Sequence, residues 1–83
     1  DQILEAYRVL ADKEGFFVEP SSAASVAGLL QQAKRGLVDA GSTIVCTVTG
    51  NGLKDTQWAL ESAKDPVVVP VDVKAAAAAL GLA

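Results

Sequence analysis

The chain has 83 residues, 51% of them hydrophobic, with a mean hydropathy of +0.32 and a formal net charge of −3. This acidic balance argues against nucleic-acid binding, which needs a basic face, and no apolar stretch approaches the roughly 20 residues of a membrane-spanning helix. With one cysteine and no histidine, the sequence offers neither an internal disulfide nor the usual ligands of a zinc site.

Two helices are predicted in the first part of the chain. Apolar residues recur at helical spacing over residues 3–13, and Gly15 is a plausible stop. A second helix is predicted over residues 21–35, because Pro20 and the serines that follow it are typical of a helix start. Small side chains in the first half of this helix would let it approach a sheet or a ligand closely.

Two short apolar runs alternate with helices in the second part. Residues 43–48 predict a buried strand, and the β-branched run 67–69 predicts another. Between them a short helix is predicted over 56–63, and Asp72 can cap a last helix over 73–80. Helices that alternate with single buried strands indicate an α/β fold.

The stretch "EGFFVEPSSAASVAGLL", residues 14–30, has two interpretations. One is an N-capped helix packed tightly on a sheet. The other is a helix start whose free N–H groups and hydroxyls face a polar ligand. Glu19 does not decide between them, because an acidic residue just before a helix suits the helix dipole without any ligand.

The stretch "TVTGNGLKD", residues 47–55, likewise predicts either a simple glycine turn or a ligand site. It matches neither the P-loop nor the dinucleotide-binding pattern. In open α/β sheets, however, ligands bind at the carboxyl ends of strands. Thr49 could offer its hydroxyl there, and Gly50 and Gly52 would let a flat ring approach the backbone.

Two residues with reactive side chains have simpler explanations. Lys54 is best explained as a solvated charge, because it lies in a Lys-Asp turn. The adjacent Asp55 would also keep it protonated, which argues against a Schiff base there. Cys46 lies in an apolar run and has no histidine to activate it, so we expect it in the core.

Taken together, these two stretches and the ending "VPVDVKAAAAALGLA" resemble the C-terminal part of the threonine synthase family. The Glu-Pro-Ser-Ser block also occurs in several related families, whereas "TVTGNGLKD" is more specific. One departure is Thr56, where the family usually has a proline. These enzymes use pyridoxal 5′-phosphate (PLP) and have fold type II, the tryptophan-synthase-β type. The resemblance implies that residues 1–83 are one segment from the C-terminal part of the larger PLP-binding α/β domain, in which helices pack on a mainly parallel sheet in three layers.

The resemblance also implies an activity, the conversion of O-phospho-L-homoserine and water into L-threonine and phosphate. Thr49 would meet the pyridine nitrogen of PLP, and a hydroxyl, unlike a carboxylate, does not hold that nitrogen protonated. The catalytic lysine and the phosphate-binding loop of the family lie upstream, so no catalytic residue is expected in this segment. The remaining residues expected near the cofactor are Gly50, Asn51 and Gly52 in the turn, and Glu19, Pro20, Ser21 and Ser22 at the helix entrance.

Several further expectations follow. The absence of methionine and the start at Asp1 favour a piece of a longer chain, which we expect to be cytoplasmic and homodimeric, without nucleic-acid or membrane partners. Alone, the segment should be inactive and should associate through exposed apolar surface. The alternatives are a segment of a sister enzyme, threonine dehydratase or cysteate synthase, or a non-catalytic α/β module that binds a small metabolite.

Overall fold

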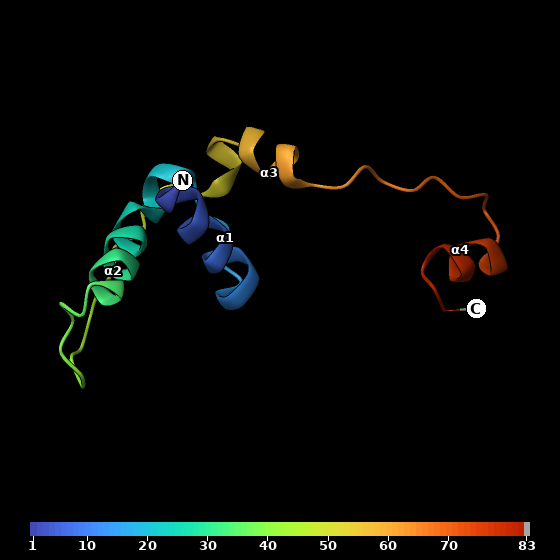
Figure 1. Ribbon diagram of the computed structural model, residues 1–83. Helices are drawn as coiled ribbons and strands as arrows, with labels where there is room; N and C mark the ends of the chain where they lie inside the picture. Colours follow the sequence, from blue (N-terminus) through green and yellow to red (C-terminus); the bar gives the residue numbers. More distant parts are fainter. Residues whose placement is uncertain (83) are drawn as a thin grey trace.

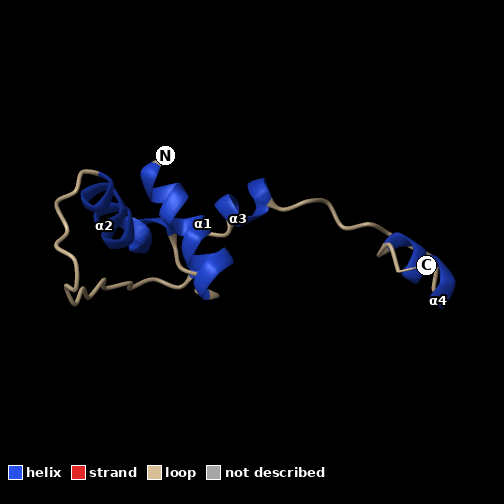
Figure 2. Cartoon of the chain, turned by 60° about the horizontal axis from the view of Figure 1, so that its bottom comes forward, coloured by secondary structure: helices blue, strands red, loops and turns tan. Residues whose placement is uncertain are grey.

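The computed structural model describes residues 1–82, which form short helices joined by turns and extended segments (Figure 1). The helices, α and 3₁₀ (η), are α1 (Gln2–Glu14), η1 (Pro20–Ala23), α2 (Ala24–Lys34), η2 (Gly52–Lys54), α3 (Gln57–Ser62) and α4 (Val73–Ala79). Within these residues the only β-type pairing is an isolated antiparallel bridge between Val18 and Asn51, and Figure 2 accordingly shows no strand.

The first two predicted helices are confirmed, and local signals explain their ends. Helix α1 ends at Gly15, which adopts the left-handed conformation (φ 72°) and donates its N–H to the carbonyl of Leu10. The entry to α2 is a 3₁₀ turn that begins at Pro20. No side chain caps η1 or α2, so the expected capping by serine is wrong.

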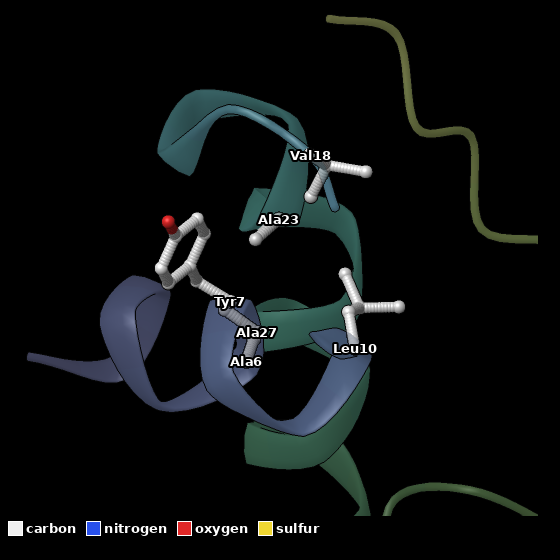
Figure 3. Packing of buried hydrophobic residues seen from close by; sticks show 6 residues of the cluster. All are labelled: Ala6, Tyr7, Leu10, Val18, Ala23 and Ala27. Atoms are coloured by element: carbon white, nitrogen blue, oxygen red, sulfur yellow. The ribbon is translucent and has the colours of Figure 1, made fainter. Parts of the chain in front are cut away.

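The small core lies where α1 crosses the start of α2 (Figure 3). Tyr7 and Leu10 of α1 pack there against Ala23 and Ala27, and the small side chains allow the two helices to approach closely. An exposed ion pair between Lys34 and Glu5 (Nζ to Oε1, 3.1 Å) adds little, because such pairs contribute about 1 kcal/mol or less. Most of the stability of this part therefore comes from the core.

Both predicted strands are corrected by the structure. Residues 43–48 and 67–69 have no ladder partner, and no sheet forms in residues 1–82. Their side chains are not buried either: Val45 is 86% exposed and Val68 is 94% exposed. A strand is stable only when neighbouring strands satisfy its N–H and C=O groups, and the described part of the chain supplies none. Cys46, expected in the core, is only half-buried.

The C-terminal part extends away from the two packed helices. In both views α4 lies at the end of a long extended segment, far from α1 and α2 (Figures 1 and 2). The radius of gyration is 17.9 Å, whereas a compact domain of this length would have about 12 Å. The prediction of α4 is confirmed, and the Asp72 carboxylate caps it by accepting the N–H of Ala75 at 2.8 Å. None of the helices within residues 1–82 has both the length and the apolar character needed to span a membrane.

A pair of glycine substitutions tests why α1 ends where it does. An added Cβ would meet nothing at Gly15 or at Gly28, so the two sites differ mainly in φ. Gly15→Ala should lower the free energy of unfolding by about 1 kcal/mol, because an L-residue is strained at positive φ. Gly28→Ala, inside α2, should raise it by up to about 1 kcal/mol. Urea unfolding of the longer chain expected from the sequence, followed by circular dichroism, measures both free energies. Equal effects at the two sites would contradict this explanation.

Candidate functional site

Two segments that are far apart in the sequence meet through their backbones. The N–H of Glu19 donates to the carbonyl of Gly50 at 2.9 Å, and the N–H of Gly52 donates to the carbonyl of Phe17 at 3.0 Å. These bonds flank the bridge between Val18 and Asn51. We call residues 17–22 together with 49–52 the junction. The structure thus brings together the helix entrance and the glycine turn that the sequence singled out.

Ser22 is the centre of the junction. It is 5% exposed, and its Oγ accepts the N–H of Gly50 at 2.6 Å and the N–H of Thr49 at 3.2 Å. The same Oγ lies 3.0 Å from Thr49 Oγ1. A buried side chain with three partners has little freedom to rotate, so Ser22 fixes both the turn and the hydroxyl of Thr49.

Glycine is needed at positions 50 and 52 because neighbouring side chains leave no room for a Cβ, and not because the backbone has a positive φ. Neither belongs to the glycines with positive φ, yet both are buried. A Cβ added at Gly50 would overlap the Glu19 side chain, and one added at Gly52 would overlap the ring of Phe17. The turn can therefore lie against the helix entrance only because these positions carry no side chain.

Asn51 supports the turn through its side chain. Its Oδ1 accepts the N–H of Leu53 at 2.9 Å and so caps η2. This is the local hydrogen bond that makes asparagine common in turns. The turn predicted for residues 47–55 is thus present, and the residue Thr49 before it is exposed.

The other residues named from the sequence lie around this centre. Glu19 is half-buried, with its side chain against Gly50, and Ser21 is exposed. Lys54 is exposed in η2, in agreement with a solvated charge. Cys46 lies outside the junction, and its Sγ is 3.9 Å from the carbonyl of Ser25.

A shallow hollow of about 240 Å³ lies beside Thr49. Its lining is mostly apolar side chains and backbone, contributed by Phe16, Phe17, Val18, Val48, Thr49, Gly50 and Asn51. In residues 1–82 no group of three or more histidine, cysteine, aspartate or glutamate side chains is placed to hold a metal ion. The hollow therefore presents apolar side chains, backbone groups, one hydroxyl and one amide at its surface.

The sequence did not reveal the role of Ser22. Both serines after Pro20 have the same local signal, a hydroxyl at a helix start, and that signal predicts capping. Only the fold distinguishes them, because Ser22 is buried against the glycine turn and Ser21 is not. A neighbouring hydrogen bond, donated by Ser25 Oγ to the carbonyl of Thr47 (2.8 Å), holds the preceding segment.

Known proteins and a protein-family model match the part of the chain that contains the junction. The model of the pyridoxal-phosphate dependent enzyme family matches residues 1–50. Threonine synthase of Mycobacterium tuberculosis is 55% identical over 83 residues, which is 100% of this chain and 23% of that protein. Threonine synthase of Halalkalibacterium halodurans is 50% identical over 76 residues, covering 90% of this chain and 22% of that protein. The chain thus spans less than a quarter of the length of these relatives.

Proposed function

The chain belongs to the family of pyridoxal-phosphate dependent enzymes, and we propose from this premise that it is a segment of a threonine synthase. The intact parent chain would convert O-phospho-L-homoserine and water into L-threonine and phosphate. The similarity to threonine synthases supports this proposal, because it extends over all 83 residues. Threonine dehydratase and cysteate synthase remain the alternatives within the same fold.

The observation that carries the proposal is the hydroxyl of Thr49, a residue that lines a shallow hollow. Its position is fixed by Ser22 at 3.0 Å, and glycine backbone lies next to it. The residues present therefore fit the pyridine ring of PLP, which needs one polar partner at its nitrogen and flat surroundings for its faces. Gly50, Asn51 and Gly52 would lie along the ring, and Glu19 and Ser21 would lie at the helix entrance beside it.

In this proposal, bound PLP supplies an electron sink for the bonds broken at the substrate carbons. The residues of this segment bind and orient the ring. Thr49 meets the pyridine nitrogen with a neutral hydroxyl, so that nitrogen is not stabilised in its protonated form. The catalytic lysine and the groups that bind phosphate come from upstream parts of the parent chain.

We also propose that the two extended apolar runs become strands in the parent. Residues 43–48 and 67–69 would join a mainly parallel sheet covered by helices, the three-layer arrangement of fold type II. The exposure of Val45 and Val68 supports this, because both would be covered in such a sheet. The parent would be a cytoplasmic homodimer without nucleic-acid or membrane partners.

The experiment that tests the proposed function is a phosphate-release assay with O-phospho-L-homoserine. The purified parent chain should release phosphate and form threonine in equal amounts. The 83-residue chain alone should form none, because it lacks the catalytic lysine. A parent that consumes threonine but releases no phosphate from O-phospho-L-homoserine would favour threonine dehydratase instead.

The behaviour of the isolated chain separates the segment from a stand-alone metabolite-binding module. We expect the isolated chain to self-associate, because large apolar side chains such as Val45 and Val68 are exposed. Light scattering should show a mass that grows with concentration, and Val45→Lys together with Val68→Lys should reduce it. A monomer that unfolds cooperatively would instead support the stand-alone module.

A further inference from the structure

The hydrogen bonds around Ser22 determine which hydroxyl donates to the other. A serine hydroxyl has one proton to donate and two lone pairs that accept. In residues 1–82, the N–H groups of Gly50 and Thr49 both donate to Ser22 Oγ, at 2.6 and 3.2 Å. Both lone pairs are then occupied. In the 3.0 Å contact with Thr49 Oγ1, Ser22 must be the donor.

The opposite direction would be unfavourable. If Thr49 donated to Ser22, three donors would compete for two lone pairs, and one backbone N–H would lose its acceptor. For the N–H of Gly50, water does not readily replace this acceptor, because Ser22 is 5% exposed and Gly50 is buried. The two backbone N–H groups therefore favour Ser22 as the donor in the contact between the two hydroxyls.

This direction determines what Thr49 can do. Its Oγ1 accepts the proton of Ser22, so its own proton remains available for a partner outside the pair. The side chain is exposed and borders the apolar hollow, so that partner would lie on the open side. A group that approaches there can accept the Thr49 proton, and an acceptor without a proton of its own fits this arrangement.

We propose that Ser22 is a positioning residue: by donating to Thr49 Oγ1 it keeps the proton of Thr49 free to be donated to an unprotonated ring nitrogen. This inference rests on the proposed function, since the acceptor is taken to be the pyridine nitrogen of PLP. It goes beyond the assignment of Thr49, because it attributes the direction of that hydrogen bond to the N–H groups that occupy Ser22.

Neutron diffraction of the deuterated parent enzyme with PLP bound tests the direction itself. We expect deuterium on Ser22 Oγ directed at Thr49 Oγ1, and deuterium on Thr49 Oγ1 directed at the ring nitrogen. Deuterium on Thr49 Oγ1 that points to Ser22, or deuterium on the ring nitrogen, would overturn the proposal. This measurement needs no substitution, so it stands even if variants of Ser22 do not fold.

Substitution gives a second readout, the nitrogen-15 resonance of PLP labelled at the ring nitrogen. Ser22→Ala in the parent should move this resonance and weaken PLP binding by about tenfold, the effect of losing one well-placed hydrogen bond. Ser25→Ala is the matched control. Ser25 also hydrogen-bonds to the segment before the glycine turn, but it does so at Thr47, which does not line the hollow. It should leave the resonance in place. Equal shifts in both variants would contradict a specific role for Ser22.

The two proposals fail in different ways. A parent chain that binds no PLP would refute the proposed function. A parent that binds PLP and forms threonine, but has the deuterium between Ser22 and Thr49 in the opposite direction, would refute only the inference about Ser22.

Discussion

Thr49→Ala in the intact parent chain is expected to lower kcat/KM for threonine formation by about 10²-fold, the usual effect of removing one preorganised donor from an active site. The hydroxyl lies 3.0 Å from Ser22 Oγ, and Thr49 lines the hollow. Without it, the ring nitrogen would lose its only partner from this segment in our proposal. A steady-state assay of phosphate release measures the change.

Two further substitutions at this position separate the hydroxyl from the shape of the side chain. Thr49→Val keeps the shape and removes the hydroxyl, so it should be as impaired as alanine. Thr49→Ser keeps the hydroxyl and should retain most of the activity. A valine variant as active as the unmodified enzyme would show that Thr49 does not act through its hydroxyl.

Helices were predictable from this sequence because the signals that begin and end them are local. Gly15 ends α1 through its own positive φ, and Asp72 caps α4 through a hydrogen bond to a residue three positions away. Neither signal depends on distant parts of the chain.

The two strands could not be predicted in the same way. The apolar pattern of 43–48 and 67–69 describes surfaces that need covering, but a strand also needs neighbours to bond with. Residues 1–82 provide none, so Val45 and Val68 remain exposed. The pairing expected for these segments is therefore not confirmed within residues 1–82.

The junction was partly predictable. Composition and position marked Glu19 to Ser22 and Thr49 to Gly52 as two candidate stretches, and the family resemblance connected them. That they touch is a property of the fold, through the bonds between Glu19 and Gly50 and between Gly52 and Phe17. Ser21 is exposed and Ser22 is buried against the turn, although they are neighbours in the same 3₁₀ helix. No local sequence pattern determines which of the two faces the turn.

Gly50→Ala is expected to be the most damaging change in the turn. Its Cβ would overlap the Cγ, Cδ and Oε1 atoms of Glu19, so the whole side chain of Glu19 would have to move and not only its end. Overpacking of this kind costs about 1–3 kcal/mol. The displaced turn would also pull the N–H of Gly50 from Ser22, and PLP binding to the parent should weaken.

A double-mutant cycle with Glu19→Ala tests this explanation, because that substitution removes all three of the overlapped atoms. In the Glu19→Ala background, Gly50→Ala should cost little, which gives a coupling free energy of about 1–3 kcal/mol between the two positions. Urea unfolding of the cofactor-free parent measures the stability, and fluorescence titration measures PLP binding. If the two substitutions are additive, the contact between Glu19 and Gly50 is not what requires glycine at this position. The requirement would then come from a group that approaches the other side of Gly50.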